Sequence, residues 1–127
     1  MLDSLTTNIY SEISVNFNQN NGVYWYTEFI KDFGNVYQYS DSEKLRHTIV
    51  NSTLVVTLLK DEIGQAGGAI CDISIEKGIG YSMEYKVKFQ EGFEWTKGGK
   101  LPGIGGGKVY AGGSDVSAGD GWFSRPV

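Results

Sequence analysis

The clearest alternation of apolar and polar side chains lies in residues 81–89. Every second side chain there is large and apolar, and the side chains between them are polar or charged. The apolar set is Met83, Tyr85, Val87 and Phe89. A period of two is typical of a β-strand with one buried face. The pattern therefore predicts a half-buried strand over 81–89, with Tyr85 in the core.

The first third of the chain carries weaker strand signals. Residues 13–17 alternate and predict a short edge strand, which ends at the Asn-rich turn over 18–22. Residues 23–30 are apolar and rich in aromatic side chains, a composition that favours a strand. Residues 37–41 have no such pattern, and we expect a loop there.

The middle of the chain predicts further strands. Residues 44–59 contain either two strands or one long strand broken near Asn51 and Ser52. The run 53–59 is largely apolar, which is typical of a strand buried on both faces. Residues 69–75 predict the next strand. Several short strands separated by turns indicate an all-β domain, an antiparallel β-sandwich or jelly roll, over the single range 1–127.

Glycine dominates the last third of the chain. Eleven of the 18 glycines lie from Gly92 to Gly121, where no periodicity is visible. A connection this long in a compact domain is usually functional or disordered. Its first part, Trp95-Thr-Lys-Gly-Gly-Lys-Leu-Pro-Gly, holds two lysines among glycines that allow the backbone to approach a ligand closely.

Charge and residue content narrow the function classes. The formal net charge of −4 argues against nucleic acid as the main partner, because phosphate binding needs a basic patch. No apolar run approaches the ~20 residues of a membrane span, and no signal-peptide pattern is visible.

Cys71 is the single cysteine, so we interpret it as a small apolar residue on a strand. His47 has no evident partner, and we interpret it as structural. Asp115 and Asp120 lack calcium-loop spacing, and we expect no metal.

A polyanionic sugar fits the local charge. Lys97, Lys100 and Lys108 cluster in sequence despite the acidic total. Lysines pair with uronate carboxylates, and an aromatic ring such as that of Trp95 stacks on sugar faces. These residues are therefore candidates for substrate binding. The alternative, a solvated loop beside a core tryptophan, stays open for each of them.

Three segments carry a resemblance to a known family: Tyr85-Lys-Val-Lys-Phe, Gly92-Phe-Glu-Trp and Lys97-Gly-Gly-Lys-Leu-Pro-Gly. Together with Gly121-Trp-Phe-Ser-Arg, they resemble polysaccharide lyase family 14, which includes algal-virus and molluscan alginate lyases. The resemblance extends over about 67–127. It implies a β-jelly roll that cleaves uronate polymers, alginate or glucuronan, by metal-independent β-elimination without a cofactor.

The resemblance also implies an incomplete molecule. The family continues past the position of residue 127 into a strand with a catalytic tyrosine pair. We therefore expect a partial jelly roll, little or no lyase activity of this chain alone, and an extracellular location for the full-length protein. The oligomeric state stays open.

Three residues are candidates for catalysis by this resemblance. Elimination requires that the C5 carboxylate is neutralised, the C5 proton removed and the leaving oxygen protonated. The family places a functional lysine at the position of Lys100, which is able to neutralise the carboxylate or act as a base. It also has a serine and an arginine two residues apart on one strand face. Here Ser124 and Arg125 are adjacent, so they should face opposite sides.

Two further functions remain open from the sequence. One is a non-catalytic carbohydrate-binding β-sandwich that keeps the groove but not the chemistry. The other is a structural β-domain with a flexible glycine loop, which would bind no glycan.

Overall fold

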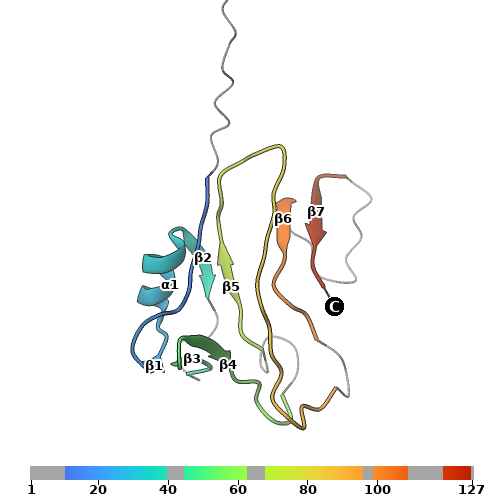
Figure 1. The fold of residues 1–127 in the computed structure, drawn as a ribbon. Helices are drawn as coiled ribbons and strands as arrows, with labels where there is room; N and C mark the ends of the chain where they lie inside the picture. The colour runs from blue at the N-terminus through green and yellow to red at the C-terminus, as the bar shows by residue number, and fades with distance from the viewer. Residues whose placement is uncertain (1–10, 40–44, 63–67, 96–98, 109–118, 127) are drawn as a thin grey trace, which may run out of the picture. The chain divides into compact units, whose positions relative to one another are not determined.

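The structure is a computed structural model of the 127-residue chain. It describes residues 11–39, 45–62, 68–95, 99–108 and 119–126. These residues form three separate antiparallel sheets and one short helix (Figure 1). The predicted all-β class is therefore confirmed, and the sandwich or jelly-roll arrangement stays a prediction. The chain divides into unit 1, Met1–Lys77, and unit 2, Gly78–Val127, which we describe one at a time.

Unit 1 contains two sheets. The first joins β1 (Gly22–Val23), β3 (His47–Val50) and β4 (Thr53–Val56), with β3 in the middle. The second pairs β2 (Val36–Tyr39) with β5 (Cys71–Ile73). The strand predicted over 69–75 is confirmed at its centre by β5. The loop expected over 37–41 is wrong, because β2 occupies all of the described part of that range, 37–39.

The turn between β3 and β4 lies where the sequence predicted a break. Asn51 and Ser52 take φ values of 49° and 56°. Positive φ at both central residues is the geometry of a tight hairpin, and asparagine tolerates it well. Of the two alternatives for 44–59, two strands is therefore correct. Burial of 53–59 on both faces is wrong, since only Leu54 and Leu59 in that run are even half-buried.

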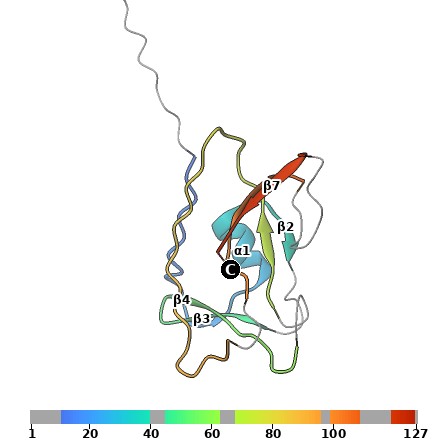
Figure 2. The ribbon, with the colours of Figure 1, turned by 90° about the vertical axis from the view of Figure 1, so that its right-hand side faces the viewer.

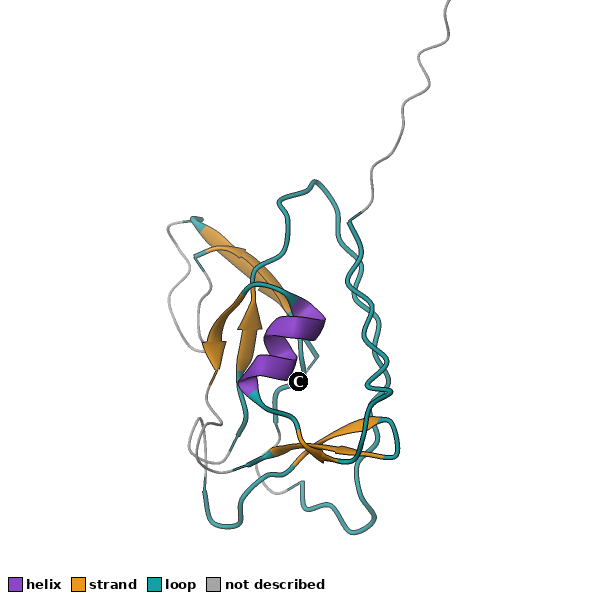
Figure 3. Ribbon diagram, turned by 90° about the vertical axis from the view of Figure 1, so that its left-hand side faces the viewer, coloured by secondary structure: helices purple, strands orange, loops and turns teal. Residues whose placement is uncertain are grey.

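The helix α1 (Tyr26–Phe33) lies where a strand was expected (Figure 3). Large apolar side chains recur at the helical spacing i, i+3, i+4, i+7, namely at Tyr26, Phe29, Ile30 and Phe33. The helix ends at Gly34, which has φ 84° and donates its N–H to the carbonyl of Ile30 at 2.9 Å. The strand predicted over 23–30 is wrong beyond Val23, because this 3.6-residue period decides the local structure. The edge strand predicted over 13–17 is also absent from the described residues.

The core of unit 1 is aromatic, and α1 lies beside β2 (Figures 1 and 2). Phe29 is 4% exposed, and its ring centroid lies 4.5 Å from that of Tyr24 and 5.0 Å from that of His47. His47 is buried and packs edge-on against Phe29, in agreement with its interpretation as structural. Cys71 is half-buried on β5, and burial raises the pKa of its thiol to about 11. Such a thiol is a packing residue rather than a nucleophile.

The described residues of unit 2 form one hairpin, β6 (Ile104–Gly107) with β7 (Gly121–Ser124). The pairing runs from Ile104 opposite Ser124 to Gly107 opposite Gly121. A Cβ on Gly106 would lie 2.5 Å from the indole Nε1 of Trp122, so this glycine leaves room for the ring across β6. The regular strand β6 in the glycine-rich range was not predicted from the sequence. This strand forms because the bulky Trp122 of its partner strand fills the space that Gly106 leaves.

The strand predicted over 81–89 is wrong. These residues form neither helix nor strand, and all of them are exposed except the half-buried Phe89. Among the described residues of unit 2, none is fully buried. Across the described parts of the chain, no helix has the length and apolar character needed to cross a membrane.

Candidate functional site

Two candidate residues, Lys100 and Arg125, lie at the open end of the β6–β7 hairpin. The N–H of Leu101 donates to the carbonyl of Pro126 at 3.3 Å, so the two chains stay hydrogen-bonded beyond both strand ends. Lys100 directly precedes Leu101, and Arg125 directly precedes Pro126. Lys100 and Arg125 are therefore each the chain neighbour of one of the two residues that share this hydrogen bond.

A glycine permits this close approach. A Cβ on Gly103 would lie 2.3 Å from the carbonyl oxygen of Ser124 and 2.4 Å from the Cβ of Arg125. Real Cβ atoms do not come so close to backbone oxygens, so any other residue at this position must push the two chains apart. We call residues 99–103 the lysine loop. The Gly-Gly-Lys-Leu-Pro-Gly sequence ends at Gly103, the residue that lets this loop rest against Arg125.

Arg125 is held by an aromatic ring. Its guanidinium carbon lies 4.5 Å from the ring centroid of Phe123, a cation–π contact that favours a fixed position of the charge. Phe123 and Arg125 share one face of the extended chain because they are two residues apart. Ser124, between them, is exposed, and its adjacency to Arg125 in an extended chain predicts that the two side chains face opposite sides.

The other candidate lysines are placed differently. Lys100 is exposed at the open end of the hairpin, four residues before β6. Lys108 is exposed directly after β6, and its N–H donates to the carbonyl of Asp120 at 3.0 Å. The four residues of β6 span about 13 Å at the usual rise per residue, so Lys108 lies at the other end of the hairpin. Lys97 lies outside the described residues.

Trp95 is part of a cluster of three aromatic rings. Its centroid lies 4.4 Å from that of Phe89 and 4.8 Å from that of Phe93, and the two phenylalanines are 5.0 Å apart. The tryptophan is nevertheless 60% exposed. The alternative of a core tryptophan is therefore wrong: the indole is supported on one side by two rings and open to solvent elsewhere.

The sequence missed the role of Tyr85. Its side chain is 37% exposed, and its hydroxyl donates to the carbonyl of Pro102 at 3.2 Å. The prediction of Tyr85 as a core residue is therefore wrong. The period-two pattern assigns a residue to a face but not to a partner 17 positions away, so no local signal revealed this contact.

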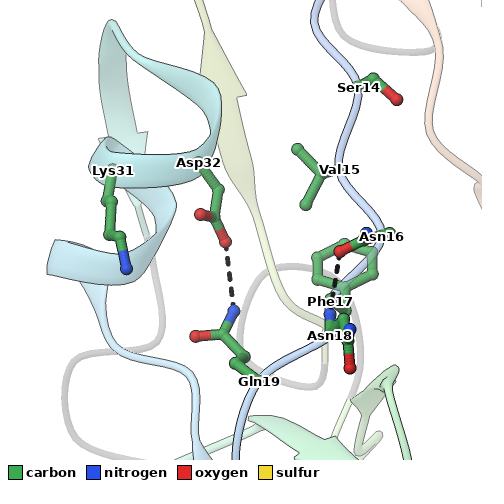
Figure 4. A pocket seen from close by; sticks show the side chains of 8 residues that line it. All are labelled: Ser14, Val15, Asn16, Phe17, Asn18, Gln19, Lys31 and Asp32. Carbon is green, nitrogen blue, oxygen red and sulfur yellow. Dashed lines mark hydrogen bonds between the residues drawn. The ribbon is translucent and has the colours of Figure 1, made fainter.

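A hollow of about 200 Å³ lies in unit 1, and none of these candidate residues lines it (Figure 4). It lies between residues 14–19 and the helix residues Lys31 and Asp32. Asp32 accepts hydrogen bonds from the amide of Gln19 at 3.1 Å and from the hydroxyl of Tyr24 at 2.6 Å. Burial, and then the bond to Asp32, raise the pKa of Tyr24 above its usual value.

The hairpin, the lysine loop and the aromatic cluster all lie in one stretch of sequence that is similar to a known protein family. Residues 71–125 match the polysaccharide lyase 14 family. The family resemblance seen in the sequence is thereby confirmed over this segment, which is a little under half of the chain. No curated protein and no solved structure matches the chain.

The polysaccharide lyase 14 match includes every candidate site residue. It begins on β5 and ends at Arg125, so it contains the hairpin up to the end of β7 and the whole of the 81–95 stretch. The open end of the hairpin presents Lys100 and Arg125, whose guanidinium lies over the ring of Phe123. The described segment 99–108 contains no carboxylate side chain. A pair of cations in this arrangement suits an anionic group, and guanidinium in particular matches the geometry of a carboxylate.

Proposed function

We propose that unit 2 carries a polysaccharide lyase-like site for uronate polymers, alginate or glucuronan, in which Lys100 and Arg125 bind the sugar carboxylate. The observation that supports it most is the hydrogen bond between Leu101 and Pro126, which are the chain neighbours of Lys100 and Arg125. Lys100 and Arg125 both lie within the matched segment. Acidic polysaccharide is the partner that two neighbouring cations and an exposed indole favour together.

The chemistry proposed at this site is β-elimination. A base removes the C5 proton, the C5–H electron pair forms the C4–C5 double bond, and the C4–O bond breaks with protonation of the leaving oxygen. Arg125, supported by Phe123, neutralises the carboxylate and so stabilises the carbanion that develops at C5. Lys100 shares this neutralisation or takes the proton. Ser124 faces the other side of the extended chain, where it contacts the neighbouring part of the polymer.

Trp95 and the remaining lysines extend the proposed site along the polymer. The indole offers a sugar-stacking surface in a position fixed by Phe89 and Phe93. Lys97 and Lys108 would pair with the carboxylates of further sugar units. Because Lys108 lies at the far end of β6, it would reach a different unit from the one that Lys100 binds.

A second function, carbohydrate binding without cleavage, is favoured by the exposed aromatic cluster. Stacking on Trp95 and charge pairing with Lys100 require no acid or base. The two functions are separated by the product: cleavage creates an unsaturated uronate that absorbs in the ultraviolet, whereas binding alone leaves the polymer intact.

The test is the affinity of the chain for uronate oligosaccharides, measured by isothermal titration calorimetry at low salt. We expect Lys100→Ala and Arg125→Ala each to weaken binding about five- to tenfold, the effect of losing one charge-assisted contact at an exposed site. Lys88→Ala, an exposed lysine of the same unit, is the matched control and should change the affinity less than about twofold. Equal losses in all three variants would indicate non-specific charge attraction and contradict the proposal.

A further inference from the structure

We propose that Tyr85 is a positioning residue for Lys100: its hydroxyl fixes the backbone of the lysine loop at Pro102. This inference rests on the function proposed above and adds to it a residue outside the hairpin and the lysine loop. Tyr85 need not touch the substrate. It acts by restricting where the main chain that carries Lys100 can lie.

Three consecutive residues of the loop are fixed by three different contacts. Leu101 donates its N–H to Pro126, Pro102 accepts from the hydroxyl of Tyr85, and Gly103 lies against the backbone of Arg125. The first and third contacts come from the end of β7 and its continuation. The second comes from the 81–89 stretch, so Tyr85 adds the one support that the hairpin itself does not provide.

The chemistry of proline explains why the carbonyl of Pro102 matters. Proline has no N–H, so its carbonyl is the single main-chain group through which this residue is able to hydrogen-bond. The Tyr85 hydroxyl reaches that group at 3.2 Å. Without the hydroxyl, the loop keeps the contacts of Leu101 and Gly103 but opens more readily, which widens the range of positions that the neighbouring Lys100 can take. Ordering the loop before binding lowers the entropic cost of placing the amine on a carboxylate.

Tyr81 provides a matched control. It lies four residues earlier in the same exposed stretch, and its hydroxyl accepts a hydrogen bond from the N–H of Gly78. Tyr85→Phe and Tyr81→Phe therefore remove the same atom from neighbouring positions. The first removes the hydrogen bond to Pro102 of the loop, and the second removes the hydrogen bond to Gly78.

The experiment uses the full chain with three measurements: hydrogen exchange of the Leu101 amide, affinity for uronate oligosaccharides, and the same affinity in a Lys100→Ala background. We expect Tyr85→Phe to speed exchange at Leu101 and to weaken binding, each about three- to tenfold, the factor for one lost hydrogen bond. Tyr81→Phe should change neither quantity. In the Lys100→Ala background, Tyr85→Phe should have no further effect on binding, because the residue acts through Lys100. The NMR signals of His47 report that unit 1 stays folded.

Three outcomes would overturn the inference. Equal effects of the two tyrosine substitutions would show a general loss of order, and an undiminished effect of Tyr85→Phe without Lys100 would show that Tyr85 acts on its own. Faster exchange with unchanged affinity would show that the anchor exists but does not position the lysine. If the unaltered chain binds no uronate, the proposed function fails, and the Leu101 exchange rate decides separately whether Tyr85 fixes the loop.

Discussion

Phe29 and Phe93 each touch two or more aromatic rings, yet they lie in very different surroundings. Phe29 in unit 1 is 4% exposed and packs against Tyr24 and His47. Phe93 in unit 2 is half-buried beside Trp95, whose indole is mostly open to water. All the residues that are fully buried among those described belong to unit 1. Unit 1 therefore has an apolar core, whereas unit 2 is held by hydrogen bonds, glycine contacts and ring pairs.

Because of this difference, the buried core and the candidate functional residues lie in different units of the chain. Nearly all of the polysaccharide lyase 14 segment, and every described candidate residue, lies in the unit without a buried core. Exposed hydrogen bonds and ring pairs each contribute only about 1 kcal/mol, so local opening there is far easier than in a packed core. Substitutions in the two units should therefore have effects of different kinds and sizes.

The largest effect is expected from Phe29→Ala. Truncating a buried phenylalanine leaves a cavity and costs about 3–5 kcal/mol of the free energy of unfolding. Urea denaturation followed through the His47 signals measures this loss in unit 1. Phe93→Ala is the matched control, and it should cost about 1 kcal/mol or less, because a half-buried ring loses less contact. Equal costs would show that unit 2 has a core as well packed as that of unit 1.

The next-largest expected effect is a decrease in the free energy of unfolding of unit 1 at alkaline pH. Burial and the bond to Asp32 raise the pKa of Tyr24, so the folded state favours the neutral phenol more than the unfolded state does. The stabilisation is fully present below the unfolded pKa of about 10 and is lost as the pH rises above it. Comparing the free energy of unfolding below and above about pH 10 measures this loss.

Tyr24→Phe tests the cause of that dependence. At neutral pH it should cost about 1.5–3 kcal/mol, the range for a hydrogen bond to a charged group. Above about pH 10 the difference between the original chain and the variant should shrink. A difference that stays constant with pH would assign the alkaline loss to other tyrosines.

The smallest effect is expected from Gly107→Ala in unit 2. Gly107 has φ 66°, and a Cβ there would lie 2.3 Å from the carbonyl oxygen of Asp120. An L-residue in this conformation costs about 1–2 kcal/mol, and the contact pushes the end of the hairpin open. Faster hydrogen exchange at the Lys108 amide, which donates to Asp120, measures the opening. The signals of Phe29 and His47 in unit 1 should not change, and a change there would show that the substitution acts beyond the hairpin.

Local sequence signals predicted the parts of the fold that depend on neighbouring residues. The β3–β4 hairpin follows from Asn51 and Ser52 between two apolar runs, and the turn has the positive φ values that such a pair adopts. The β5 strand followed in the same way from a β-prone run. Helix α1 was missed because aromatic content was given more weight than spacing, although Tyr26, Phe29 and Phe33 already showed a helical period.

The parts that depend on distant partners were not predictable in this way. The β6 strand consists largely of glycine, and it forms because Trp122 lies across Gly106 on the opposite strand. The 81–89 stretch has the alternation of a strand, but no partner strand pairs with it in the described residues, and its apolar side chains stay exposed. At the candidate site, the sequence motifs identified Lys100 and Arg125 separately. The hydrogen bond between their chain neighbours Leu101 and Pro126, and the contact from Tyr85 to Pro102, join residues too far apart in sequence for a local pattern to reveal.

The close approach at Gly103 has a consequence for how this protein tolerates variation. The residue has no side chain to offer a ligand, yet any substituent there would separate the lysine loop from Arg125. In a saturation library selected for uronate binding, position 103 should be depleted of variants as strongly as position 100. Such a screen would report a functional residue whose contribution is the empty volume beside its α-carbon.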